Sequence, residues 1–180
     1  MANHLSTELT RFATEPVVLT DSAVHGSTVH FKQARVTVAT AMIDNADDNI
    51  ILLRLDPDDR PVSVKFWNTD LDSDGAPALA VNVGCWRIPN EGRKGETPVV
   101  LDADAFASAA TFLQAAADGT EVMHEDKTPN PITDRGQKMW EIAGLTAKPA
   151  YDIYIGLDVT TAAATAATGT IVVEVQYTRS

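Results

Sequence analysis

Alternation of apolar and polar residues between positions 50 and 86 limits the fold of this chain more than any other feature of its sequence. Every second residue is apolar in the runs 62–66 and 79–85, which is the period of antiparallel strands with one buried face. Between these runs, residues 70–77 are rich in Asp, Gly and Pro, residue types that turn a chain. The pattern predicts strands joined by acidic turns at 56–61 and 70–77, with the second turn closing a β-hairpin.

Further strands are predicted towards the end of the chain. The runs 151–159 and 171–177 have an apolar residue at every second position, and they predict a second hairpin. The linker between them, 160–169, has only small side chains and is expected to be an exposed loop. Counting all segments gives roughly seven or eight strands, so the predicted fold class is mainly β, an antiparallel β-sandwich or a jelly-roll-like fold.

Residues 28–43 predict one long strand or two shorter ones, because β-branched side chains are frequent there. Val29 and Phe31 fall out of phase with the apolar residues at the end of this run. If both sets faced the core, the strand would need an extra residue between them. We therefore expect a bulge between Lys32 and Arg35.

The stretch that most resembles a helix lies at about residues 104–118. Asp102 or Asp104 is suited to cap its start, and Gly119 is suited to end it. The apolar face of this segment is mild, so we expect one helix that covers a side or an end of the sheets. A second, short helical turn is predicted around residues 137–143, with its apolar side chains against the core.

A chain of 180 residues is long enough to bury one core. We predict a single β-sandwich domain over residues 27–180, preceded by an extended N-terminal arm over residues 1–26. The arm has no sustained period; it is either a frayed terminus or a segment that orders on a neighbouring subunit. Its short apolar patch supplies the candidate partner-binding residues Phe12, Val17, Val18 and Leu19.

The formal net charge of the chain is −11. This charge would repel a phosphate backbone, and the basic residues are scattered, so nucleic acid is not an expected partner. No run is apolar enough to span a membrane, and the N-terminus lacks the pattern of a signal peptide. These features predict a soluble protein that is made in the cytoplasm and has no membrane partner.

The sharpest local motif is Asp70-x-Asp72-x-Asp74-Gly75, which matches the opening of a calcium-binding loop. An EF-hand also needs a bidentate Glu at its twelfth position, where this chain has Val81, and flanking helices, where it has predicted strands. We therefore expect either a plain acidic turn or a cation site of another type, with Asp70, Asp72 and Asp74 as metal ligands and calcium as the ion. No other cofactor is expected.

The sequence contains none of the catalytic motifs that can be recognised from residue spacing. The single cysteine, Cys85, lies inward on a strand pattern, and the four histidines are dispersed. We therefore predict no catalytic residues and no enzyme activity. Trp67 and Trp86 fall on the polar phase of their strands. There they could stack on a sugar, although core or interface positions are commoner for tryptophan.

The order of several short landmarks resembles that of a protein family. These landmarks are RLDPDDRPVSVKF, VNVGCW, DADAF, KMWEIAGL, PAYDIYIGLDV and GTIVVEVQY, and they lie between residues 41 and 178. The chain is similar in this respect to the small virion structural proteins encoded in the head-gene region of tailed bacteriophages. The resemblance implies a capsid decoration, or cement, protein without catalytic residues.

A protein of that family would bind the outer surface of the major capsid shell and stabilise it. The resemblance therefore implies the major capsid protein and sister copies in a homo-oligomer as partners, with a trimer as the expected state. It also implies that the protein is made in the host cytoplasm and resides on the exterior of the virion. Three alternatives remain open: a head-tail connector or tail structural protein, a calcium-assisted carbohydrate-binding jelly-roll module, and an enzyme whose carboxylates converge only in three dimensions.

Overall fold

The structure is a computed structural model, and it describes residues 28–89, 97–123 and 136–179. Short helical segments in these ranges are the 3₁₀ turns η1 (Thr40–Met42) and η3 (Phe112–Gln114) and the helix α2 (Met139–Ile142). The strands are β1 (Val29–Val38), β2 (Asn49–Leu55), β3 (Arg60–Asn68), β4 (Ala80–Arg87), β5 (Val99–Ala110), β6 (Ala117–Glu121), β7 (Ile153–Thr161) and β8 (Gly169–Thr178).

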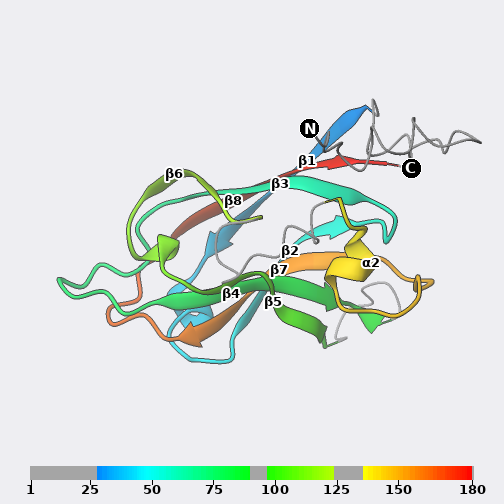
Figure 1. The fold of residues 1–180 in the computed structure, drawn as a ribbon. Helices are drawn as coiled ribbons and strands as arrows, with labels where there is room; N and C mark the ends of the chain where they lie inside the picture. Colours follow the sequence, from blue (N-terminus) through cyan, green and yellow to red (C-terminus); the bar gives the residue numbers. More distant parts are fainter. Residues whose placement is uncertain (1–27, 90–96, 124–135, 180) are drawn as a thin grey trace, which may run out of the picture.

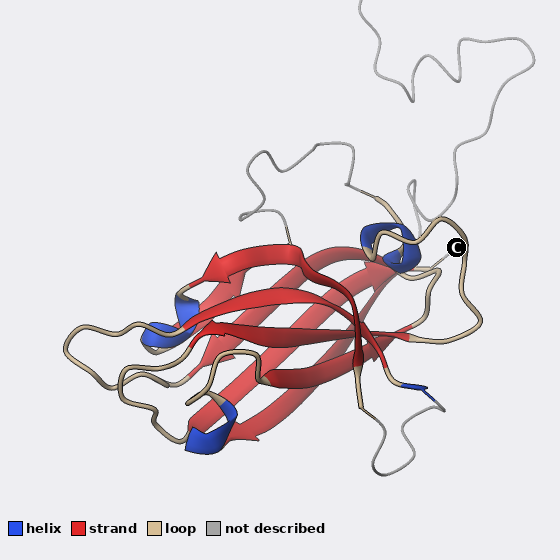
Figure 2. Ribbon diagram, turned by 90° about the horizontal axis from the view of Figure 1, so that it is seen from below, coloured by secondary structure: helices blue, strands red, loops and turns tan. Residues whose placement is uncertain are grey.

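The strands form two four-stranded antiparallel sheets, shown in Figures 1 and 2. Their orders are β1-β8-β3-β6, here named the β1 sheet, and β2-β7-β4-β5, here named the β2 sheet. The first strand pairs with the last, the second with the seventh, the third with the sixth and the fourth with the fifth. This is the order of a long hairpin rolled into a sandwich, which defines a jelly roll. The predicted mainly β sandwich is confirmed.

Both connections that were predicted as hairpins instead cross between the sheets. Residues 70–77 lead from β3 in the β1 sheet to β4 in the β2 sheet, and residues 162–168 lead from β7 to β8 in the opposite direction. A turn-rich loop between two alternating runs looks the same in sequence whether its strands pair or face each other. The hairpin predictions were therefore wrong, although the strands themselves are present.

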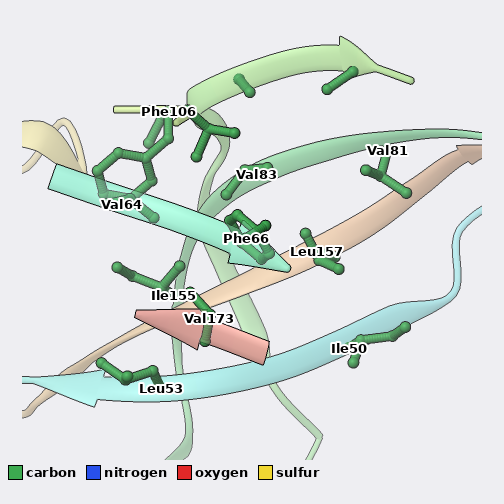
Figure 3. Close-up of a cluster of buried hydrophobic side chains, with 14 of the residues drawn as sticks. Ile50, Leu53, Val64, Phe66, Val81, Val83, Phe106, Ile155, Leu157 and Val173 are labelled. Atoms are coloured by element: carbon green, nitrogen blue, oxygen red, sulfur yellow. The ribbon is translucent and has the colours of Figure 1, made fainter. Parts of the chain in front are cut away.

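The core lies between the inner faces of the two sheets (Figure 3). Val64 and Phe66 of β3 and Leu157 of β7 have no exposed surface. On β3 the buried residues alternate with the partly exposed Ser63, Lys65 and Trp67. Burying a side chain of this size contributes about 1.5–3 kcal/mol. This repeated gain explains why a period of two in the sequence produces these strands.

The expected bulge in the first strand is absent. β1 pairs with β8 without a register shift from Val29 to Val38. The even-numbered residues at the end of β1 face the core, and the out-of-phase residues Val29 and Phe31 are instead exposed by 55% and 73%. The prediction failed because it assumed that every apolar side chain would be buried.

The helix predicted at 104–118 is also absent. This segment contains the end of β5, the 3₁₀ turn η3 and the start of β6. The pairing of β5 with β4 has register shifts at three places, and Ala109 adopts a positive φ of 51°. Each shift inserts residues that break the period of two, and the remaining apolar spacing imitates that of a helix. Pairing with β4 overrides the helix propensity of the alanines.

Close approach of β5 to β4 depends on a glycine. A Cβ atom built on Gly84 would lie 2.2 Å from the carbonyl oxygens of Asp102 and Ala103. A side chain at position 84 would therefore push the bulged part of β5 away from its neighbour.

The short helix predicted around 137–143 is confirmed as α2, whose Met139 and Ile142 pack in the core. The predicted arm at 1–26, with Phe12, Val17, Val18 and Leu19, lies outside the described residues. Among the residues that are described, no helix is long and apolar enough to cross a membrane.

Candidate binding surface

The acidic motif at residues 70–75, which the sequence suggests as a candidate cation site, holds two loops together. Asp72 is 1% exposed. Its carboxylate accepts four backbone N–H bonds, from Ala78 at 2.7 Å, Leu79 at 2.9 Å, Ala164 at 3.0 Å and Thr165 at 2.8 Å. The first two donors belong to its own loop, and the other two belong to the β7–β8 connection. A single side chain therefore fixes both crossings at one end of the sandwich.

These backbone donors also set the ionisation of Asp72. Burial raises the pKa of this carboxyl, but the hydrogen bonds from Thr165, Leu79, Ala164 and Ala78 outweigh burial and lower the pKa to about 2. The carboxylate is thus charged at neutral pH even though it is buried. Oriented peptide dipoles stabilise its charge.

The small-residue linker packs against this carboxylate. It was predicted to be an exposed loop, but Ala163 and Ala166 are partly buried against the core. Further backbone bonds join the two crossings, from Ser73 N–H to Thr165 O at 3.1 Å and from Ala167 N–H to Leu71 O at 3.0 Å. Small side chains allow this close contact between two loops.

Of the other two aspartates of the motif, Asp70 bonds within its own loop, whereas Asp74 also reaches the β7–β8 connection. Asp70 accepts the N–H of Asp72 at 3.1 Å, and Asp74 accepts the N–H of Ala76 at 2.9 Å and the hydroxyl of Thr165 at 3.0 Å. In the described ranges, no three His, Cys, Asp or Glu side chains are grouped as metal ligands. A cation held by Asp70, Asp72 and Asp74 stays a prediction, and the bonds of Asp72 to the backbone do not favour it.

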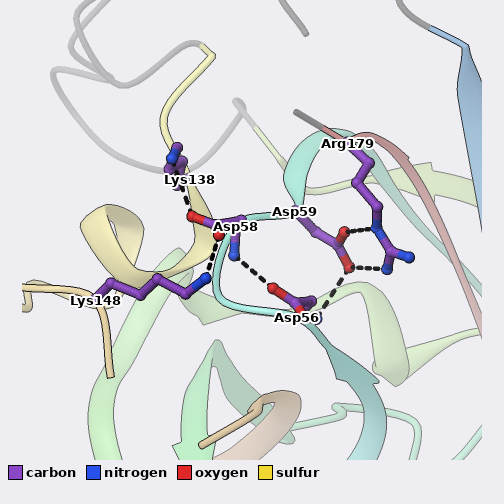
Figure 4. A network of polar contacts seen from close by, with 6 residues as sticks. All are labelled: Asp56, Asp58, Asp59, Lys138, Lys148 and Arg179. Atoms are coloured by element: carbon purple, nitrogen blue, oxygen red, sulfur yellow. Dashed lines mark hydrogen bonds and ion pairs between the residues drawn. The ribbon is translucent and has the colours of Figure 1, made fainter. Parts of the chain in front are cut away.

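A second acidic turn, at residues 56–59, lies at the other end of β3 and is neutralised by basic side chains (Figure 4). Asp58 forms ion pairs with Lys138, at 2.9 Å, and with Lys148. Hydrogen bonds from Lys148 and then Lys138 lower the pKa of Asp58. These pairs connect the β2–β3 turn to α2 and to the segment that precedes β7.

Asp59 is the buried member of this turn, with no exposed surface. Its carboxylate accepts Arg179 Nε at 2.8 Å and Arg179 Nη2 at 3.3 Å, and it also accepts the N–H of Asp56 at 2.9 Å. The Asp59 carboxylate raises the pKa of Arg179. This contact holds the end of β8 against the β2–β3 turn, so the arrangement is structural.

Two side chains that could have carried chemistry, Cys85 and Trp86, lie in the core. Cys85 is fully buried among apolar residues, where a thiol is inert. Trp86 is also buried and therefore offers no platform for a sugar. His30 packs against the ring of Tyr177 at a centroid distance of 5.6 Å. The absence of enzyme activity remains a prediction.

Among the described residues, large exposed apolar side chains lie on the outer face of the β1 sheet and at Val99 and Val100 of β5. Val29, Phe31 and Val62, here named the Phe31 patch, are exposed by 55%, 73% and 49%. Phe31 lies opposite Gln176, which lies opposite Ser63, the neighbour of Val62. Two strand spacings therefore separate Phe31 from Val62, roughly 10 Å. Exposed apolar groups that gather in this way are typical of interaction sites.

A hollow lies on the same sheet, several residues further along the strands. Its volume is about 330 Å³, and it is lined by Trp67 and Asn68 of β3, Ala117 and Asp118 of β6, and Thr170 and Val172 of β8. Trp67 is partly exposed, as its polar phase predicted. The Phe31 patch and this hollow, both on the β1 sheet, form the candidate binding surface.

Sequence reasoning missed the Phe31 patch although its signal was present. The out-of-phase position of Val29 and Phe31 was interpreted as a bulge, whereas it marks apolar side chains on the solvent side of a regular strand. Val62 gave no comparable signal, because its exposure follows from the register shift between Pro61 and Ser63.

The fold is similar to that of proteins in phage capsids. It resembles a chain in the capsid of Ralstonia phage GP4 with a TM-score of 0.57 and 20% sequence identity, over 85% of this chain and 85% of that chain. It also resembles a chain in the capsid asymmetric unit of cyanophage Pam1 with a TM-score of 0.55 and 18% identity, over 91% of this chain and 93% of that chain. No protein-family model and no curated protein matches the chain.

At these identities the likeness shows the fold. The chain therefore has a jelly-roll sandwich of a kind that occurs in phage capsids, and the role of such a fold has to be argued from its surface.

Proposed function

We propose that this chain is a phage capsid decoration protein that binds the outer surface of the major capsid shell and stabilises it. The observation that carries the proposal is the fold, because chains from two phage capsids match it over 85% and 91% of this sequence. The sequence landmarks between residues 41 and 178 support the same class. The proposed partners are the major capsid protein and sister copies in a homo-oligomer, with a trimer as the expected state, on the exterior of the virion.

The described surface suits such a role. The acidic turns are occupied by structural bonds, and Val29, Phe31 and Val62 are exposed on the outer face of the β1 sheet. Two members of the Phe31 patch, Val29 and Phe31, are at the start of β1, directly after the proposed arm in the sequence. The arm residues Phe12, Val17, Val18 and Leu19 and this patch would together contact the shell.

Stabilisation follows from binding equilibrium. A protein that binds the assembled shell and not the free subunits adds its binding free energy to the assembled state. Because each shell offers many equivalent sites, even a modest affinity per site would resist expansion or loss of subunits.

Co-sedimentation of the purified protein with capsids stripped of decoration and tails tests the proposal. We expect saturable binding at a copy number set by capsid symmetry, and weaker binding after deletion of residues 1–26. Absence of binding to intact shells would overturn decoration. The remaining candidate functions would then be a head-tail connector, a tail component or a carbohydrate-binding module.

A further inference from the structure

The edge formed by β1 differs from the other sheet edges in the described part of the chain. β1 is the edge strand of the β1 sheet, next to β8 (Figure 1), and its ten residues pair without a register shift. The other edge strands, β2, β5 and β6, all have register shifts in their pairing, and β6 has only five residues. Short or bulged edges resist pairing with another chain, whereas a long, regular edge is a template for it.

The residues of β1 also favour a further strand beside it. The strand, VHFKQARVTV, contains no proline and no glycine and is rich in β-branched residues. Among the described residues, β1 pairs with β8 and with no second strand, so the backbone groups on its other side are not paired within these residues. Addition of a strand to such an edge is a common mode of protein association.

The two cationic side chains of β1 do not block this edge. Lys32 reaches across to the other sheet, where its Nζ donates to the carbonyl oxygen of Arg54 at 3.1 Å. Arg35 is exposed on the outer face, and Glu174 of β8, which lies opposite Gln33, is diagonal to it. A partner strand therefore does not have to displace either side chain.

The sequence of β1 is complementary to a second copy of itself. In an antiparallel pair around a two-fold axis, opposed residues share a face, so odd-numbered residues oppose odd-numbered residues. The register centred on Gln33 pairs the whole strand, with Val29 opposite Thr37 of the second copy. It also places Phe31, which is 73% exposed, opposite Arg35. An arginine beside an aromatic ring is a favourable cross-strand pair, and the symmetry forms it twice.

Neighbouring registers are less favourable. A register centred on Lys32 would oppose two lysines, and one centred on Arg35 would oppose two arginines. Like charges directly opposite each other destabilise a pair of strands. In the register centred on Gln33, Lys32 is opposite Ala34, and no two charged side chains are opposed.

We infer that β1 pairs antiparallel with β1 of a second copy of this chain, in the register centred on Gln33. The contact is isologous and closes after two copies, so it is separate from the three-fold contact expected of a trimer. The inference goes beyond the proposed function and does not rest on it. The pairing uses the edge of the sheet, so the two Phe31 patches would lie on one outer face, with their Phe31 residues about 14 Å apart.

Crosslinking of the full chain tests the register. Gln33→Cys places a thiol on the two-fold axis, where opposed residues are close enough for a disulfide. Thr37→Cys is the matched control, because it is also exposed on β1 but would lie roughly 26 Å from its own copy. The native Cys85 is buried. Under mild oxidation, we expect a covalent dimer of the first variant only. Equal crosslinking of both variants, or of neither, would overturn the inference.

Association is measured by sedimentation velocity over a series of protein concentrations. We expect a dimer, or an even-numbered assembly if a three-fold contact is also present. Phe31→Lys places a lysine opposite Arg35 and should weaken this association about tenfold. Val62→Lys, which makes the same change at an exposed outer-face position on β3, should leave it unchanged.

A charge exchange separates pairing from a general effect of the substitution. In the double variant Phe31→Lys with Arg35→Glu, opposite charges would face each other across the two-fold axis, so it should associate more tightly than Phe31→Lys alone. These two positions are too far apart along one strand to form a pair within a chain. A double variant that associates no more tightly than Phe31→Lys would contradict the register.

Other occupants of the edge give different results. A chain that stays monomeric up to about 0.5 mM would overturn the inference and leave the edge to a strand of another protein. Association that is lost on deletion of residues 1–26, without crosslinking of Gln33→Cys, would assign the edge to the arm and also overturn it. Because these experiments contain no capsid, their outcome is independent of whether the chain decorates shells.

Discussion

Two acidic loops at opposite ends of β3 stabilise their buried carboxylates in different ways. At the end of the strand, Asp72 is surrounded by four backbone N–H donors from two crossings between the sheets. Before its start, Asp59 is paired with the half-exposed Arg179, and Asp58 is paired with lysines. The first carboxylate is held by peptide groups that the fold fixes in place. The second set depends on side chains that reach solvent.

This comparison teaches that similar acidic turns in a sequence can have unequal structural importance. Peptide dipoles around Asp72 are insensitive to salt and cannot be replaced by water without opening two loops. Ion pairs at residues 56–59 are partly solvated, and solvent weakens such pairs. We therefore expect the two ends to respond differently to mutation, acid and salt.

The largest effect is expected from Asp72→Ala. This change would leave four backbone N–H groups without their acceptor in a buried position, and we expect a loss of about 4 kcal/mol in the free energy of unfolding. Urea denaturation measures it. Asp70→Ala, in the same loop but exposed, is the control and should change the free energy by less than about 1 kcal/mol. Equal effects of the two variants would show that Asp72 does not hold the crossings.

The stability of the protein at low pH should also depend on Asp72. The pKa of Asp72 in the folded protein is lowered to about 2 from 3.8, so its contribution is complete above about pH 4 and is lost as pH falls towards 2. The loss amounts to about 2 kcal/mol. The free energy of unfolding measured at pH 4, 3 and 2 should show this decline. In the Asp72→Asn variant the free energy of unfolding should depend less on pH. An unchanged slope in the variant would contradict the assignment.

Asp59→Ala should have a smaller effect, roughly 1.5 kcal/mol, because Arg179 can be solvated once its partner is removed. Thermal unfolding of Asp59→Ala and Arg179→Met measures the two sides of the pair. We expect the aspartate variant to be the less stable, since Asp59 also accepts the N–H of Asp56. If Arg179→Met were the less stable variant, packing of the arginine side chain would contribute more than its ion pair with Asp59.

The smallest effect is expected from the lysines that lower the pKa of Asp58. In the double variant Lys138→Met with Lys148→Met, stability should fall slightly at low salt and should match that of the unchanged protein at 1 M NaCl, where screening is strong. Chemical denaturation with urea at the two salt concentrations gives the comparison. A salt-independent loss would show that these side chains act through packing.

Much of the sandwich could be predicted from sequence because burial of one sheet face leaves a period of two. The runs around Phe66 and Leu157 show this period. The short helix with Met139 was predicted from its own apolar side chains. Pairing could not be predicted, because Asp72 joins loops that are about 90 residues apart, as its bond to Ala164 spans 92 positions. The bulged β5 was mistaken for a helix for the same reason: its spacing depends on contact with Gly84.

The candidate surface was harder to predict than the fold. The polar phase of Trp67 left its partial exposure open, but the hollow beside it needs β6 to bulge at Gly119. The role of Phe31 depended on which face of a strand is outside, and local sequence does not determine that face.

Binding of two matched variants to stripped capsids tests the central claim most directly. Val29→Ser with Val62→Ser alters the Phe31 patch, and Val99→Ser with Val100→Ser alters valines on β5 that are exposed by 38% and 47%. If the chain decorates shells through the outer face of the β1 sheet, the first variant should sediment with capsids at least tenfold more weakly than the second. Equal binding of both variants would contradict that claim.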